Sequence, residues 1–187
     1  MITLVSEGIW DFNLDAALAK ISEQRREQAL KFKYEQGRRT CVLAYELLKQ
    51  GLREGYGITG NPLFEYGEHG KPSLVGHPDI HFNLSHCRDA VVCAIGNEPV
   101  GIDVESVREY RESLVRYTMN DSEVAQIEAA QNPAMAFTRL WTMKEAAFKL
   151  IGTGIDNNLK DIISPHYRFT TVEAANGCYA YTICTLR

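Results

Sequence analysis

Two acidic residues in one short segment are candidates for metal-ion chemistry. In VGIDVE (100–105), Asp103 and Glu105 lie two positions apart in a run that is typical of a β-strand. Alternate residues of a strand project from the same face, so these two carboxylates would lie side by side. A shared divalent cation with oxygen ligands, Mg²⁺ or Mn²⁺, relieves the repulsion between such groups. The alternative is an exposed strand face with two unrelated acids, which this short motif alone does not exclude.

A third acidic candidate is Glu145, which lies between Lys144 and Lys149 in the segment WTMKEAAFKL. In a helix, residues four apart share a face, so Trp141, Glu145 and Lys149 would stack one turn apart. The alternative is a surface Glu–Lys pair that contributes a few tenths of a kcal/mol to stability. An apolar neighbourhood is an unusual setting for an acid without a partner. We therefore hypothesise that this carboxylate joins the two strand carboxylates in one site.

Two further motifs carry side chains that are suited to binding phosphate. Lys71 stands in the turn GKP (70–72), and His86 ends the strand-like segment NLSH (83–86). Both side chains can donate hydrogen bonds to phosphate oxygens, although each motif alone also fits a purely structural role. Ser85 and His86 do not form a good hydrolytic dyad, because adjacent strand residues point to opposite faces and the chain has no GxSxG motif.

The elements that would position these motifs follow from hydrophobic periodicity, and together they predict the α+β class. Strands are expected at 2–5, 80–85, 90–96 and 100–105, with a hairpin formed by 168–174 and 178–186. Helical patterns cover about 14–54, 106–119, 121–130 and 134–151. A Gly/Pro-rich section between the first helical region and residue 80 is interpreted as turns around one or two short strands.

Composition places the chain among ordinary globular proteins. It has 187 residues, of which 45% are hydrophobic and 24% charged. It lacks an apolar run long enough to span a membrane, and the N-terminus does not resemble a secretion signal. The five cysteines form an odd set without CxxC spacing, which favours reduced thiols in the cytoplasm over disulfides or a zinc site.

Charge is distributed unevenly along the chain. The net charge of −4 argues against general nucleic-acid binding. However, residues 20–53 contain nine basic and only four acidic side chains. Solvated helix faces explain most of these residues, but a basic patch on an acidic protein also suggests an anionic ligand or an acidic partner.

Taken in order, the motifs GKP, FNLSH, GIDVE and WTMKEAAFK resemble those of the 4′-phosphopantetheinyl transferases. The resemblance is to the longer, pseudo-dimeric type represented by the surfactin-synthetase-activating enzyme. It extends from about residue 66 to residue 154, and more loosely over the basic helices before it. It implies a monomer with two similar α/β halves, 1–98 and 99–187, related by a pseudo-two-fold axis with the active site at their interface.

The resemblance also implies a reaction. These enzymes transfer the 4′-phosphopantetheine arm of coenzyme A to a serine of an apo acyl or peptidyl carrier protein, with Mg²⁺, and release adenosine 3′,5′-bisphosphate. Carried over to this chain, the family's metal ligands are Asp103, Glu105 and Glu145. The implied catalytic residues are Glu145, Lys149 and Asp103. The implied coenzyme contacts are Lys71, Ser85, His86, Arg39, Thr40, Lys144 and Lys149.

Several alternatives stay open from the sequence. The base that deprotonates the carrier serine is either Glu145 or a metal-bound water, and we favour Glu145. Further basic residues that align with family contacts are harder to place; the residues around those positions are Arg25, Arg26, Gln28 and Lys31. The rival functions are a Mg²⁺-dependent phosphohydrolase and a non-catalytic module that binds coenzyme A or a carrier protein. The carrier and its biosynthetic pathway, whether fatty-acid, polyketide or non-ribosomal peptide, are not specified.

Overall fold

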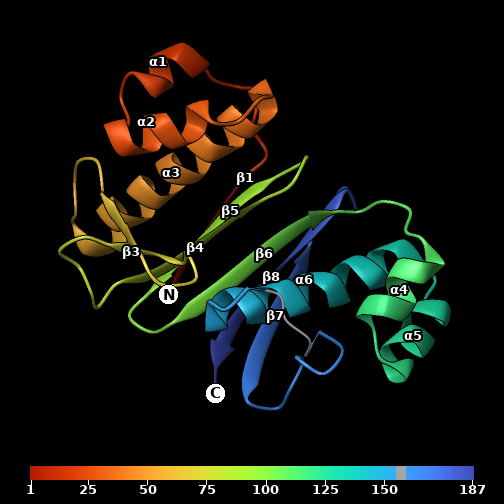
Figure 1. The fold of residues 1–187 in the computed structure, drawn as a ribbon. Helices are drawn as coiled ribbons and strands as arrows, with labels where there is room; N and C mark the ends of the chain where they lie inside the picture. Colours follow the sequence, from red (N-terminus) through yellow and green to blue (C-terminus); the bar gives the residue numbers. More distant parts are fainter. Residues whose placement is uncertain (155–158) are drawn as a thin grey trace.

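Two three-stranded antiparallel sheets form the framework of the protein, and each packs against a long helix (Figure 1). This computed structural model describes residues 1–154 and 159–187. Its strands are β1 (Ile2–Ser6), β2 (Phe64–Tyr66), β3 (Pro72–Leu74), β4 (His81–His86), β5 (Val91–Gly96), β6 (Val100–Ser106), β7 (Tyr167–Glu173) and β8 (Tyr179–Leu186). Its helices are α1 (Leu14–Leu18), α2 (Glu23–Leu30), α3 (Glu35–Tyr56), α4 (Glu112–Thr118), α5 (Asp121–Glu128) and α6 (Pro133–Ile151).

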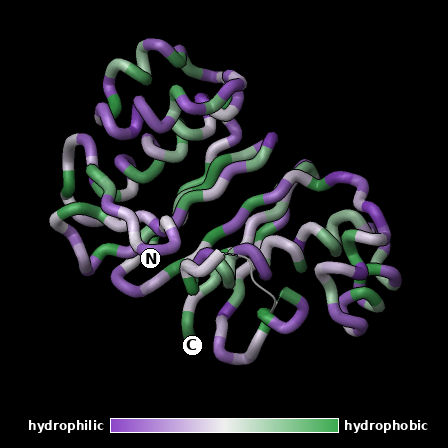
Figure 2. Tube along the Cα trace, viewed as in Figure 1, coloured by the Kyte–Doolittle hydropathy of each residue, from purple (hydrophilic) through white to green (hydrophobic). Residues whose placement is uncertain are grey.

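The first sheet has the order β1-β5-β4 and is covered by α3. The central strand β5 has the sequence VVCAIG and is buried along its whole length, and it is coloured as hydrophobic in Figure 2. Helix α3 presents apolar residues to this sheet, including Leu47, Leu48 and Leu52, which all belong to the same core cluster. A helix and a sheet that each have one apolar face gain stability by burying those faces against each other.

The second sheet has the order β6-β8-β7 and packs against α6. Gly101 of β6 makes this contact close, because a Cβ atom added at Gly101 would lie 2.6 Å from the backbone nitrogen of Leu150 on α6. A glycine lets helix and strand backbones approach to a distance that no other residue allows. Gly101 thereby brings α6, which carries Glu145 and Lys149, directly over the strand that carries Asp103.

Side chains join the two sheets at a junction between their edge strands β4 and β6. Strand β4 pairs with β5, and β6 pairs with β8. At the junction, the backbone N–H of Ile102 donates to Asn83 Oδ1 at 3.0 Å. The backbone N–H of Val104 donates to Ser85 Oγ at 3.4 Å. Two buried polar side chains of β4 thus satisfy edge amides of β6, as buried backbone donors require.

The α+β class and the expected strands are confirmed, as is the helix around WTMKEAAFKL. That helix ends at Ile151, and Gly152 follows it with a left-handed φ of 85°. Two helical predictions need correction. The pattern over 14–54 forms three helices: Ser22 caps a new start at α2 with its side chain, and Tyr34, in an extended conformation, precedes the start of α3. Of the pattern over 106–119, only α4 is helical.

Other sequence expectations can be compared with the structure. All five cysteines are free thiols. Among the helices of residues 1–154 and 159–187, none combines the length and apolar character needed to cross a membrane. The proposed division into 1–98 and 99–187 stays a prediction.

We expect Gly101→Ala to destabilise the protein, because the new methyl group would force α6 away from β6. Overpacking of this kind costs about 1 to 3 kcal/mol, which denaturant unfolding would measure. Gly96→Ala is the matched control, since a Cβ at this other strand glycine meets no atom closer than 3.7 Å. Equal stabilities of the two variants would contradict the close-approach role of Gly101.

Candidate functional site

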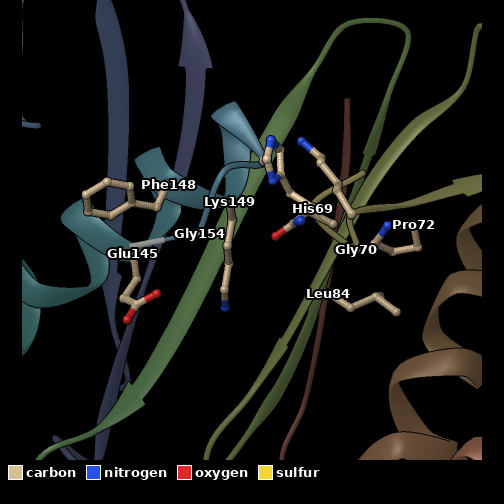
Figure 3. A pocket seen from close by; sticks show the side chains of 11 residues that line it. His69, Gly70, Pro72, Leu84, Glu145, Phe148, Lys149 and Gly154 are labelled. Carbon is tan, nitrogen blue, oxygen red and sulfur yellow. The ribbon is translucent and has the colours of Figure 1, made fainter. Parts of the chain in front are cut away.

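A cavity of about 330 Å³ opens where the C-terminal half of α6 faces the turn before β3 and strand β4. In Figure 3, Glu145 and Lys149 extend from α6, while His69, Pro72 and Leu84 lie across from them. The residues that line the cavity are His69, Gly70, Lys71, Pro72, Asn83, Leu84, Glu145, Phe148, Lys149, Gly152 and Gly154.

The carboxylate of Asp103 forms the charged centre beside this cavity. The residue is only 3% exposed, so its charge requires partners. Its Oδ1 atom accepts hydrogen bonds from Lys149 Nζ at 2.6 Å and from Ser85 Oγ at 2.9 Å. Lys149 Nζ also lies 2.7 Å from Ser85 Oγ. Three elements, β4, β6 and α6, therefore meet at one hydrogen-bonded group.

Glu145 and Glu105 lie within the electrostatic influence of Asp103. Burial, followed by the charge of Asp103, raises the pKa of Glu145 to about 7, while Lys149 opposes that shift. The same two causes, in the same order, raise the pKa of Glu105. The charge of Asp103 thus acts on both glutamates, and Lys149 is a neighbouring cation that opposes the two shifts.

The oxygen donors suit a hard cation such as Mg²⁺. Asp103 Oδ2 is buried and has no hydrogen-bond partner within the described part of the chain, which is the condition of an acceptor that could bind a cation. However, among residues 1–154 and 159–187 no three Asp, Glu, His or Cys side chains are arranged as a metal-binding group. The donor chemistry therefore fits the metal, whereas the carboxylates are not drawn together into a coordination shell.

Lys71 lines the cavity from the turn before β3. Its Nζ atom donates to the backbone carbonyl of Leu150 at 2.8 Å, near the C-terminus of α6. A cation is favourable at a helix C-terminus, where backbone carbonyls lack partners. Burial lowers the pKa of the Lys71 ammonium. Lys71 thus ties the turn to the helix that carries Glu145 and Lys149.

The prediction that Lys144 contacts phosphate is wrong for this structure. The Lys144 side chain is fully buried, with 0% exposure, and lies 2.9 Å from Glu123 Oε2 of α5. It also donates to the carbonyls of Leu159 at 2.9 Å and Lys160 at 3.0 Å. These three acceptors satisfy all three protons of the ammonium group. Lys144 therefore holds α6 to α5 and to the backbone of Leu159 and Lys160, and its ammonium group is not exposed to a ligand.

His86 and Thr40 line a second hollow, beyond Ser85 along β4, whereas Arg39 does not. This hollow of about 360 Å³ is lined by residues that include Lys33, Thr40, His86 and Arg88. Within it, the hydroxyl of Thr40 donates to the carbonyl of Gly37 at 3.2 Å. Arg39 is engaged elsewhere: its guanidinium pairs with Glu35 at 2.8 Å and donates to the carbonyl of Phe12 at 2.8 Å.

The sequence analysis did not identify two residues that matter in this region, Asn83 and Glu123. Asn83 lines the cavity and supports β6, although its motif FNLSH had drawn attention only to Ser85 and His86. Glu123 was not expected to pair with Lys144. An Asn within an apolar strand was an available signal for Asn83, because a buried amide needs partners. For Glu123 the only signal was its place three residues after the cap Asn120, which fits the capping box that it forms.

Comparison with known proteins finds similarity over the region that contains GIDVE and WTMKEAAFK. A model of the 4′-phosphopantetheinyl transferase superfamily matches residues 99–182. The 4′-phosphopantetheinyl transferase AcpT of Salmonella typhimurium is 32% identical over 136 residues, which are 62% of this chain and 71% of that protein. A 4′-phosphopantetheinyl transferase of Bacillus subtilis is 28% identical over 144 residues, 75% of this chain and 64% of that protein.

A further relative, the 4′-phosphopantetheinyl transferase psf-1 of Bacillus pumilus, is 32% identical over 142 residues, 74% of this chain and 61% of that protein. The chain thus spans less than two thirds of the length of the two Bacillus relatives. The matched region contains β6 and α6, the elements that bring Asp103 and Glu145 to the site. On the strength of these similarities, the chain belongs to the 4′-phosphopantetheinyl transferase superfamily.

Proposed function

We propose that this protein transfers the 4′-phosphopantetheine arm of coenzyme A to a serine of an apo acyl or peptidyl carrier protein. One observation carries the proposal: in a chain of the transferase superfamily, Glu145 and Lys149 line a cavity, Lys149 pairs with Asp103, and the charges of Asp103 and Glu105 act on Glu145. In the reaction, the serine oxygen forms a bond to the phosphorus that bears the pantetheine arm. The bond from that phosphorus to adenosine 3′,5′-bisphosphate breaks, and the bisphosphate leaves.

The three carboxylates would hold Mg²⁺, with Mn²⁺ as an acceptable substitute. When bound, the metal supplies Lewis acidity and neutralises charge on the pyrophosphate. The buried Oδ2 atom of Asp103 supports this assignment, because it has no hydrogen-bond partner within the described residues. The raised pKa values of Glu145 and Glu105 support it as well, since a cation would offset both the burial and the repulsion from Asp103 that raise them.

Glu145 is the proposed base for the carrier serine. Its pKa of about 7 suits a group that accepts a proton near neutral pH. It lines the cavity with Lys149, one helical turn away. Lys149 would contact the phosphate, where a positive charge stabilises the charge that develops during phosphoryl transfer. Lys71 enters the same cavity from the opposite side and would support the coenzyme there.

The basic segment 20–53 is the proposed docking region for the carrier or for the coenzyme 3′-phosphate. Its Lys33 and Thr40 line the second hollow together with His86, so the region is continuous with the strand that bears Ser85. We further propose that the two sheet-and-helix units are the related halves of a monomer, with the active site at their interface. The free cysteines are consistent with a cytoplasmic location.

The direct test is to incubate the protein with coenzyme A, Mg²⁺ and several apo carrier proteins, and to weigh the carriers by mass spectrometry. We expect at least one carrier to gain the mass of one phosphopantetheine. A carrier whose acceptor serine is replaced by alanine is the control and should gain nothing. Loss of coenzyme A without an adduct would instead indicate the phosphohydrolase. Coenzyme binding without consumption would indicate a non-catalytic module.

Glu145→Gln should lower the turnover number by about 100-fold or more, because the amide keeps the shape of the side chain but accepts no proton at neutral pH. Steady-state transfer kinetics measure this effect. Glu128→Gln, on the exposed surface of α5, is the matched control and should leave turnover unchanged. Near-normal turnover in the Glu145 variant would exclude the carboxylate as the base.

In the metal-free protein, replacing Glu145 should also change the free energy of unfolding in a way that depends on pH. A carboxyl group whose pKa is raised by folding stabilises the protein fully below its unfolded value and loses that contribution as pH rises through about 7. Glu145→Gln should therefore be more stable than the parent at pH 8, by about 1 to 2 kcal/mol after allowance for solvent screening. At pH 4 the two should unfold alike. Equal denaturant midpoints at pH 8 would contradict the raised pKa.

A further inference from the structure

Asn83 occupies the junction between the strand of the proposed coenzyme contacts and the strand of the carboxylates. Its side chain is buried, with 7% exposure. Its Oδ1 atom accepts the N–H of Ile102 at 3.0 Å. The residue after Ile102 is Asp103. Asn83 therefore fixes the backbone at the position from which the central carboxylate projects.

The neighbouring contacts indicate why this fixation matters. The amides on either side of Asp103 along the same edge, those of Ile102 and Val104, are both held by side chains of β4. The opposite edge of β6 pairs with β8, with Asp103 in register with Thr182. Because β6 is held along both edges, its translation relative to β4 is restricted. That translation would change the separation between Asp103 and Ser85.

Ser85 and Asn83 of β4 hold β6 in different ways. Ser85 Oγ contacts the Asp103 carboxylate, Lys149 and the Val104 amide at once. A group with three partners adjusts when any one of them moves, so it is a weak anchor for the strand. Among the described contacts, Asn83 Oδ1 has one backbone donor, at the shorter distance of 3.0 Å. Asn83 is consequently the residue that sets the register of the junction.

We propose that Asn83 is a positioning residue, which holds β6 so that the Asp103 carboxylate meets Ser85 and Lys149 in the geometry that transfer requires. The proposal rests on the proposed transferase function for its kinetic consequences. Asn83 acts through the Ile102 amide and needs no contact with the reacting atoms. Productive sites tolerate displacements of only about 0.5 Å, and a misplacement of about 1 Å costs on the order of 100-fold in rate.

The hydrogen bond can be tested without turnover, by amide hydrogen exchange monitored by NMR. The Ile102 amide should exchange slowly in the parent protein, although it lies on the edge of β6 away from β8. Asn83→Leu keeps a similar volume but provides no acceptor, and it should speed exchange at Ile102 by at least about 10-fold. Asn83→Ser should retain part of the protection, because a serine hydroxyl already accepts the Val104 amide at the same junction.

Transfer kinetics then separate positioning from general stability. Asn83→Leu should lower kcat by about 10- to 100-fold while the KM for coenzyme A changes by less than about threefold, and Asn83→Ser should fall between it and the parent. Thr118→Val is the matched control, because it removes another buried hydrogen bond, from the Thr118 hydroxyl to the carbonyl of Leu114 on α4. The control should keep the parent kcat.

Either of two kinetic results would overturn the proposal: a kcat that does not follow the order of Ile102 protection across Asn, Ser and Leu, or an equal loss of kcat in Thr118→Val. If Asn83→Leu does not fold, the comparison of Asn with Ser decides in the same way. If the parent itself modifies no carrier, the proposed transferase function fails, whereas the exchange rates still decide whether Asn83 holds β6. Unchanged exchange in the variants would sink the positioning role even in an active enzyme.

Discussion

The buried charge of Asp103 is the constraint around which this structure is arranged. A carboxylate taken out of water needs partners that replace its hydration, and here those partners come from two other elements, Ser85 of β4 and Lys149 of α6. Satisfying the charge therefore requires β4, β6 and α6 to meet. The glycine at position 101 permits the approach of α6, and Asn83 links the two strands. The contacts that hold these elements together are therefore also the contacts that form the candidate site.

Lys144 and Lys149 illustrate how one helix serves two purposes. Five residues of α-helix turn the chain by about 500°, which leaves the two side chains about 140° apart. Lys149 consequently faces Asp103, whereas Lys144 faces α5, where Glu123 and two carbonyls enclose it. Breaking such a buried pair exposes the remaining charge to a large desolvation cost. Lys144 is thus part of what holds α6 in place, and its burial conflicts with the sequence-based assignment of phosphate binding to this residue.

The sequence predicted those features that depend on local pattern. The alternation in VGIDVE and the i,i+4 spacing from Glu145 to Lys149 were sufficient to find the strand and the helix that carry the site. Features that depend on tertiary contact were not predictable in this way. The partner of Lys144 lies 21 positions earlier in the chain, at Glu123, and no periodicity relates them. The helical rotation that separates Lys144 from Lys149 could have been calculated from the sequence. The helix face of each residue in a motif therefore has to be worked out separately.

The two oxygens of Asp103 would allow Lys149 and the proposed metal to contact the same carboxylate. Lys149 is the cation that now contacts Asp103 Oδ1, while Oδ2 has no partner among the described residues. Burial is the main cause of the raised pKa of Glu145, and the negative charges of Asp103 and Glu105 add to it, while Lys149 opposes it. A site with excess negative charge attracts a cation, and the free oxygen of Asp103 offers a position that does not displace Lys149. On our proposal, Asp103 would help to hold the metal through Oδ2 while Lys149 keeps its contact with Oδ1.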